Sequence, residues 1–232
     1  MIIKLLAHSR LSDDAFNEFK DVCEDAVSDG QIISLAAIRQ CYSHKTACEV
    51  LETESKKYFG DKGKEGSRLM NHIIKSGHTS TMEHTHFTFT VEGVSRALLA
   101  QLTRHRQLSF SVQSQRYNKF SSDSRSGGFD YLVPNTVTDQ HSLTKFELMM
   151  KDIQDMYDDL IALGIPQEDA RSVLPNAACV NLVTSGNLRA WLEFYKKRKK
   201  GEGAQAEIAE FAEHIKNEIV NVEPWAKEYF EM

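Results

Sequence analysis

The amino-acid sequence predicts a single α+β domain over residues 1–232, with a mostly antiparallel sheet in its first half flanked by helices, and a helical C-terminal half. The segment THFTFTVEG, residues 85–93, alternates strictly between polar and apolar side chains, which is typical of a strand with one face in the core. Residues 143–164 repeat apolar side chains at helical spacing. No stretch is long enough to link two domains, and a chain of 232 residues can bury a core without metal or disulfide bonds.

In the first half, the elements follow from local periodicity and from glycines that end them. A short apolar run opens the chain and predicts a strand, and Gly77 and Gly93 end the helix and the strand that precede them. The elements expected here are a strand at residues 1–6, helices at 33–42 and 67–77, a strand at 85–93 and a helix at 94–105.

The second half begins with a Ser/Gly-rich segment, residues 121–130, which predicts a surface loop. Glycine and proline then set helix boundaries, because proline can begin a helix but interrupts one that is already formed. The helices expected here cover residues 143–164, a short stretch from Pro166 to Pro175, residues 187–200 and residues 204–220.

Composition limits the possible functions and locations. The formal net charge of −5 argues against a general nucleic-acid-binding surface. The apolar run at the N-terminus is too short for a signal peptide, and no stretch has the length of a membrane span. The cysteines lack CxxC spacing, which predicts free thiols in a reducing compartment, so we expect a cytoplasmic protein. They are Cys23, Cys41, Cys48 and Cys179.

One short segment concentrates positive charge in this acidic chain. RHRQLSFSVQSQRY, residues 104–117 and here called the basic segment, holds three arginines, one histidine and three serines. Guanidinium and hydroxyl groups together are typical of a phosphate-binding site. Solvated arginines at a helix C-terminus would explain the charge without a ligand. Helical spacing would also place Gln101 beside Arg104 and His105.

Four histidines lie just before the basic segment and raise the question of a metal site. They are His72, His78, His84 and His86. Zinc sites on helices use two histidines four residues apart, and the sequence has only Glu83 beside His84. The spacing therefore predicts no metal site.

The segment GHTSTMEHTHFTFTVEGVSRALLAQLTRHRQLSFSVQSQRY resembles the flavin-dependent thymidylate synthases. The signature of that family, Arg-His-Arg followed by seven residues and Ser, stands here at residues 104–106 and Ser114. Three later segments also resemble the family in the same order. They are ARSVLP at residues 170–175, NLRAWLEF at 187–194 and AQAEI at 204–208.

The resemblance implies an α+β fold and the methylation of dUMP to dTMP. Methylenetetrahydrofolate would supply the carbon, and electrons would pass from NADPH through FAD, although the sequence does not separate NADPH from NADH. No cysteine nucleophile is expected, because an arginine would instead stabilise negative charge on the uracil. The expected assembly is a homotetramer whose active sites are built from several subunits.

The resemblance also assigns residues to roles. Arg198 and His78 would be catalytic, with Arg198 polarising the uracil and His78 beside the flavin. The residues expected to bind FAD are Ser80, Arg104, His105, Arg106, Asn187, Arg189 and Glu193. The residues expected to bind dUMP are Gln101, Arg104, Ser114, Gln115, Arg116, Arg171 and Arg198.

Two positions depart from the family pattern. Val112 stands where relatives carry Glu or Gln, and the family spacing points to Lys199 where we choose Arg198, since guanidinium suits the pyrimidine edge better. A flavin-binding protein without methylation activity therefore stays an alternative. Two others are an RNA- or anion-binding module and a structural helical domain with solvated arginines.

Overall fold

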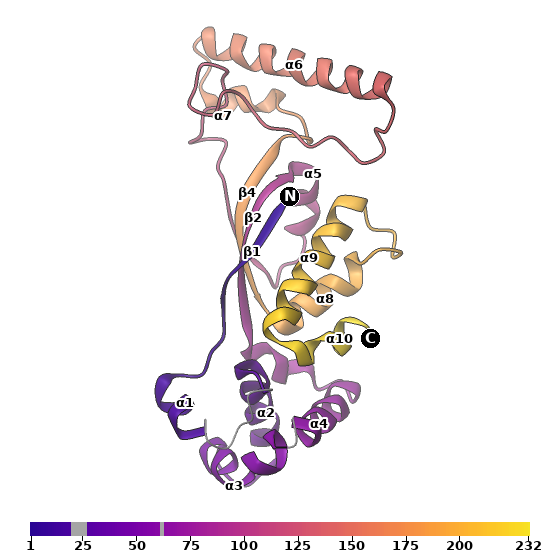
Figure 1. Cartoon of the computed structure of the whole chain (residues 1–232). Helices are drawn as coiled ribbons and strands as arrows, with labels where there is room; N and C mark the ends of the chain where they lie inside the picture. The colour runs from indigo at the N-terminus through magenta and orange to yellow at the C-terminus, as the bar shows by residue number, and fades with distance from the viewer. Residues whose placement is uncertain (20–26, 61–62) are drawn as a thin grey trace.

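The computed structural model describes residues 1–19, 27–60 and 63–232. The described residues form one four-stranded antiparallel sheet with the strand order β1-β2-β4-β3. Figure 1 shows this sheet in the middle of an elongated chain, between a group of helices at one end and one long helix at the other. The strands are β1 (Ile2–His8), β2 (His86–Ser95), β3 (Ser109–Val112) and β4 (Cys179–Asn187).

Strand β2 confirms the alternating pattern of residues 85–93. Phe87, Phe89 and Val91 are fully buried on one face, while the threonines between them are half-buried on the other. The strand does not end at Gly93 as expected. Its register with β4 shifts between Val91 and Val94, and Gly93 adopts a φ of +67°, so the glycine forms a bulge and the strand continues to Ser95.

Strand β4 is an addition to the second half of the chain, which is mostly helical as expected. It is an inner strand of the sheet and pairs with both β2 and β3. Val180, Leu182 and Thr184 are buried on one face, as a period of two residues requires. Its polar residues interrupt the apolar pattern, so periodicity alone did not predict a strand here. The fold class is still α+β, with one strand contributed by the second half.

The helices of the first half gather at one end of the sheet, except for the last, which follows β2 (Figure 1). We did not expect α3; it begins at a capping box in which Thr46 and Glu49 each bond the other's backbone N–H. These helices are α1 (Asp13–Phe19), α2 (Asp29–Tyr42), α3 (Ala47–Phe59), α4 (Lys64–Lys75), the 3₁₀ helix η2 (Thr79–His84) and α5 (Arg96–Leu102).

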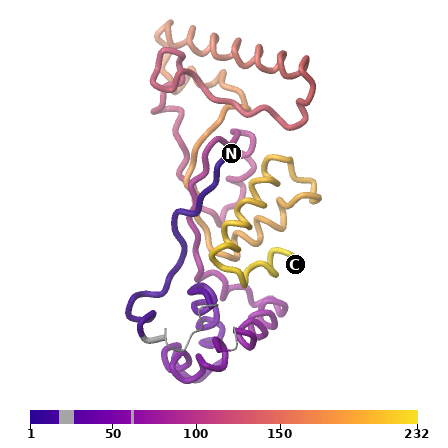
Figure 2. The backbone as a smooth tube through the Cα atoms, in the orientation of Figure 1, coloured from indigo at the N-terminus to yellow at the C-terminus, as the bar shows by residue number. Residues whose placement is uncertain are grey.

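The predicted helices of the second half are confirmed, and the backbone trace in Figure 2 shows that they separate into two groups. At the end of the molecule opposite α1–α4 lie α6 (Gln140–Ala162), α7 (Gln167–Ala170) and η3 (Arg171–Val173). Beside the sheet lie α8 (Leu188–Arg198), α9 (Ala206–Val222), η4 (Pro224–Ala226) and α10 (Lys227–Phe230). No helix among the described residues is both long enough and apolar enough to cross a membrane.

The main core lies between the sheet and helices α8 and α9. Trp191 is fully buried there and meets Phe89 of β2 edge-on, with ring centroids 5.3 Å apart. Phe194 and Phe211 continue the aromatic packing between the two helices. This packing fixes α8 against the sheet, and with it the residues at both ends of the helix.

Candidate functional site

The basic segment begins just after α5, which ends at Leu102 and not at residue 105 as expected. Turns follow, in which the His105 N–H donates to the carbonyl of Leu102 at 3.0 Å. Arg104 and Arg106 are exposed, and neither has an ion-pair partner among the residues that the structure describes. The two guanidiniums on either side of His105 are therefore available to an anionic ligand.

Arg198, at the C-terminal end of α8, lies against the basic segment. Its Nε donates to His105 Nε2 at 3.1 Å, and its second terminal nitrogen reaches the carbonyl oxygen of Gln101 at 3.4 Å. The Gln101 side-chain amide in turn donates to Gln205 Oε1 at 2.6 Å. The structure thus brings together three predicted residues, Gln101, His105 and Arg198. Lys199 instead uses its backbone N–H to close α8 on Tyr195.

His105 is held in its neutral form. Its ring is half-buried and meets Phe194 edge-on at 4.8 Å. Burial, followed by the charges of Arg198 and Lys197, lowers the pKa of His105 from 6.5 to about 4. Since Nε2 accepts a hydrogen bond from Arg198, the neutral ring carries its proton on Nδ1, which is then a donor for a ligand.

This depressed pKa predicts a loss of stability in acid. The unfolded chain binds a proton at His105 from pH 6.5 downward, while the folded chain resists it until about pH 4. The melting temperature should therefore fall as the pH drops from 6.5 to about 4. The melting temperature of His105→Gln should fall less steeply, because the glutamine cannot take up that proton. Thermal melts from pH 3.5 to 7.5 test this, with the exposed His141→Gln as the control. A difference between wild type and His105→Gln that is constant with pH would contradict the assignment.

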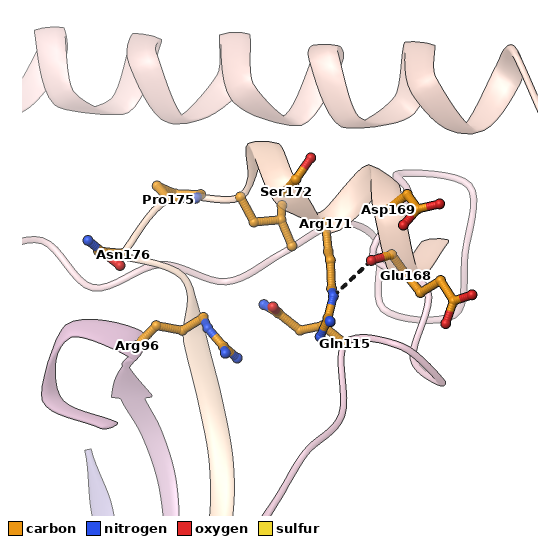
Figure 3. A pocket seen from close by; sticks show the side chains of 9 residues that line it. Arg96, Gln115, Glu168, Asp169, Arg171, Ser172, Pro175 and Asn176 are labelled. Carbon is orange, nitrogen blue, oxygen red and sulfur yellow. Dashed lines mark hydrogen bonds between the residues drawn. The ribbon is translucent and has the colours of Figure 1, made fainter. Parts of the chain in front are cut away.

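A second group of predicted residues lines a cavity of about 540 Å³ beneath α6. Figure 3 shows Arg171 and Gln115 directed into this space, together with Arg96, which lies at the start of α5. Gln115 is buried, and the Nε of Arg171 donates to the carbonyl oxygen of Glu168 at 2.9 Å. The cavity therefore presents two guanidiniums and an amide, which are donors for an anion or a polar base.

Two further residues of the basic segment stand beside this cavity. Arg116 pairs with Glu168, a lining residue, at 3.0 Å. Ser114 Oγ accepts the backbone N–H of Arg116 at 3.2 Å, and its carbonyl oxygen accepts the backbone and side-chain amides of Asn118. The Ser114 hydroxyl can still donate to a ligand. Since Ser114 and Arg116 come from one tight turn, the signature serine is placed by the same loop that carries the arginine.

Arg96 is a residue that we did not predict. Burial, followed by the nearby charge of Arg171, lowers its pKa, so the two cations face each other across the cavity. A sequence signal was present, because a cation in the first turn of a helix is opposed by the helix dipole. An arginine in that unfavourable position suggests an anionic ligand.

The third group lies around η2 and the start of α8. Arg189 donates to Glu83 at 2.6 Å and to Glu193 at 3.1 Å. Asn187 caps α8 by accepting the Ala190 N–H through Oδ1, which leaves its side-chain NH₂ free to donate. Two of the predicted flavin contacts, Arg189 and Glu193, are therefore joined in one ion-pair network.

His78 and Ser80 lie on the same side of this group, before and within η2. Both are exposed. The His78 ring stacks on Tyr42 from the end of α2, with ring centroids 6.0 Å apart, and its Nδ1 contacts the Tyr42 hydroxyl. Among the described residues, no three His, Cys, Asp or Glu side chains gather as they would around a metal ion.

The cavity group and the group around η2 lie at opposite ends of the sheet. Ser95 pairs with Cys179 at the end where Arg96 and the cavity lie, and His86 pairs with Asn187 at the other end, next to η2. Strand β2 spans roughly 30 Å at the usual rise per residue. Hence His78 and Arg189 cannot reach a ligand held by Arg171 within one chain.

An arginine-lined cavity, together with a loop whose arginines have no ion-pair partner among the described residues, is typical of proteins that bind phosphorylated ligands. Comparison with known proteins narrows this class. The family model for the thymidylate synthase complementing protein matches residues 22–225. The chain belongs to the flavin-dependent thymidylate synthases, as predicted, and is therefore an enzyme of dTMP synthesis.

Relatives with sequences similar to this chain carry that family name. The flavin-dependent thymidylate synthase of Geobacter sulfurreducens is 37% identical over 193 residues, covering 83% of this chain and 78% of the relative. That of Haloarcula marismortui is 32% identical over 230 residues, covering 89% and 93%. The solved flavin-dependent thymidylate synthase of Helicobacter pylori, complexed with FAD and dUMP, superposes with a TM-score of 0.69 at 22% identity, covering 100% of this chain and 98% of that one. This likeness confirms the predicted fold class.

Proposed function

We propose that this chain converts dUMP to dTMP, with methylenetetrahydrofolate as carbon donor and NADPH as electron donor through FAD. The observation that best supports this proposal is the path of residues 101–116. This one segment carries the residues that contact Arg198 and also reaches the arginine-lined cavity. A substrate with both a phosphate and a polar base needs such a combination.

The residues of the basic segment fit the phosphates of FAD. Arg104 and Arg106 offer two exposed guanidiniums without ion partners among the described residues, and His105 offers Nδ1–H between them. Pyrophosphate is well matched to such donors. The other expected contacts would come from Ser80, Asn187, Arg189 and Glu193. When bound, FAD supplies the hydride that reduces the transferred carbon to a methyl group.

The cavity residues fit dUMP, which carries about two negative charges near neutral pH. Arg171 and Arg116 would neutralise the phosphate, Gln115 and Ser114 would donate hydrogen bonds to it, and Arg104 would reach the nucleotide from the loop. The Glu168 carboxylate pairs with Arg116, whereas Arg171 contacts the backbone carbonyl of Glu168 through Nε, so the terminal nitrogens of Arg171 would be the donors to the phosphate. This arrangement recognises a nucleoside monophosphate in preference to a nucleoside.

Arg198 would act on the uracil. Its guanidinium is oriented by His105 and Gln101, and would donate to the N3/O4 edge of the base, where negative charge grows as C5 becomes nucleophilic. Neutral His105 accepts from Arg198 without adding a competing positive charge. Gln101 would contact the base beside it, and His78 would face the flavin from the other group.

No cysteine is assigned to the chemistry. Cys41 and Cys48 are exposed on α2 and α3, and Cys179 is half-buried at the start of β4. Burial raises the pKa of Cys179, which keeps that thiol protonated and a poor nucleophile. Cys23 lies outside the described residues.

The assembly is proposed to be a homotetramer with shared active sites, in the cytoplasm. The separation of His78 and Arg189 from Arg171 along the sheet supports sharing, because a flavin held at one end of a chain can meet dUMP held at the other end only if different subunits supply the two sets of contacts.

The test is tritium release from [5-³H]dUMP by the purified protein with FAD, NADPH and methylenetetrahydrofolate. We expect release that depends on all three additions, together with formation of dTMP. Flavin-loaded protein that releases no tritium would contradict the proposal. That outcome would favour the alternative of a flavin-binding protein without methylation activity. One observation fits this alternative. Val112 of β3 pairs with Leu182 of β4 and packs on the core, so its side chain offers no polar contact.

A further inference from the structure

Helix α6 has an apolar face that no described part of the chain covers. Met149, Met156 and Leu163, which follows the last residue of α6, are between 56% and 78% exposed. Tyr157 lies about 80° around the helix from Met149, where it is fully buried and packs with Phe120 and Ala170, and Leu160 borders the same cluster. Figures 1 and 2 show α6 as the outermost element at its end of the molecule, with α7 and loops on one side only.

The exposed apolar residues follow a regular spacing. Met149, Met156 and Leu163 are seven residues apart, with half-buried Ile153 and Leu160 between them. At about 100° per residue, these five side chains fall within about 80° of one another. This narrow band, here called the α6 stripe, has the width of a seam between two packed helices and not of a whole core-facing surface.

Charge is distributed unevenly along the same helix. Residues 140–151 carry two lysines and one glutamate, whereas residues 152–162 carry four aspartates and no lysine. Lys145 and Asp159 both flank the α6 stripe on the same side, at about 40° and 80° from Met149. Both are exposed, and neither has an ion-pair partner among the described residues.

We infer that the α6 stripe docks against α6 of a second copy of this chain, with the two helices antiparallel about a two-fold axis near residue 152. Such an axis sets Met149 opposite the partner's Met156. It also sets Lys145 near the partner's Asp159, twice by symmetry. Antiparallel helices further place each lysine-bearing half, and each helix N-terminus, beside the acidic half of the other. Parallel helices would instead bring like charges together.

Asp152 lies close to the axis in this arrangement, where two copies would approach one another. Asp152 is exposed and lies about 60° around the helix from Met149, at the margin of the α6 stripe, so water can solvate both carboxylates. The inner face of α6 packs on Val173 and Leu174, next to the cavity. The contact between copies would therefore also hold the segment that carries Arg171.

This inference deepens the proposed homo-oligomer by naming one of its contact surfaces, and its test measures mass instead of activity. Sedimentation equilibrium is run over a range of protein concentrations for wild type, Lys145→Asp, Asp159→Lys and the double variant. Each single variant should weaken the association about tenfold, since it turns two attractive contacts into repulsive ones. The double variant restores opposite charges across the axis and should return to within about threefold of wild type.

Lys151→Glu is the matched control, because it changes charge by the same sign on the same helix but points away from the α6 stripe. It should associate like wild type, and Met156→Glu should associate least. A monomeric wild type would overturn the inference, and so would a double variant no better than the singles. The methylation proposal is tested separately, by measuring tritium release from the same protein once its assembly is known.

Discussion

Arg198→Ala is expected to retain FAD and to lose nearly all methylation. The guanidinium would stabilise charge that exists on the uracil only as the transition state forms, and removing such a donor typically costs about 3–4 kcal/mol in turnover. Turnover should then fall on the order of 100- to 1,000-fold. FAD retention is expected because the hydrogen bonds of Arg198 among the described residues go to His105 and Gln101, and not to the proposed phosphate contacts Arg104 and Arg106. Flavin absorbance and tritium release from [5-³H]dUMP measure the two properties on the same sample.

Two further variants, Ser114→Ala and Lys199→Ala, test whether the loss of methylation is specific to Arg198. Ser114→Ala removes one hydrogen bond to the nucleotide, which should cost about 1–3 kcal/mol and leave measurable activity. It has no base held beside it, so we do not treat it as a nucleophile. Lys199→Ala should be close to wild type, because the backbone of Lys199 caps α8 while its neighbour makes the contacts. A dead Ser114→Ala together with a nearly normal Arg198→Ala would reverse these roles.

The choice between Arg198 and Lys199 shows what sequence could and could not predict. Counting from Gln205 pointed to Lys199, and only the chemistry of the guanidinium favoured Arg198. The structure places Arg198 on the last turn of α8, where its side chain reaches His105 and Gln101. A one-residue difference at a helix end rotates the side chain by about 100°. The sequence does not record that rotation, because it depends on where α8 stops.

Other features depend on contacts between distant segments. The period of β2 was visible because its buried face is apolar and its other face polar, whereas β4 has polar Thr184 on its buried face and apolar Val183 on its exposed face, and was missed. Arg96 became a candidate only when folding placed it opposite Arg171, 75 positions away in the sequence. The signature motif named candidate residues for the site, and their roles stay predictions. It could not predict that they divide into groups at opposite ends of the sheet, because a motif carries no information on the distance between segments.

Glu223 joins the C-terminal end of the chain to the start of α2, and we expect its removal to lower the stability of the fold strongly. Its carboxylate is fully buried and accepts hydrogen bonds from the Ser28 hydroxyl, from the Gly30 N–H at 3.1 Å and from the indole of Trp225. Burial raises the pKa of this carboxyl, and the three donors oppose that rise. The Gly30 and Trp225 donors cannot turn toward water.

Glu223→Ala should lower the free energy of unfolding by about 2–6 kcal/mol. The buried Gly30 N–H and the indole N–H of half-buried Trp225 would both lose their acceptor, at about 1–3 kcal/mol each. Urea unfolding followed by circular dichroism measures this difference. Glu228→Ala is the matched control, since Glu228 is an exposed carboxylate whose bond to Asn71 is on the surface. That variant should change stability by no more than about 0.5 kcal/mol.

Gly30→Ala tests the same site from the opposite side. Alanine normally stabilises a helix by about 1 kcal/mol over glycine, but a Cβ at Gly30 would lie 2.5 Å from the Glu223 carboxyl carbon. We therefore expect Gly30→Ala to destabilise the wild-type protein. In the Glu223→Ala background the carboxyl is gone, and the same substitution should cost much less, so the two changes should not be additive. Additive effects, or a stabilising Gly30→Ala, would show that the carboxylate does not occupy this position in solution.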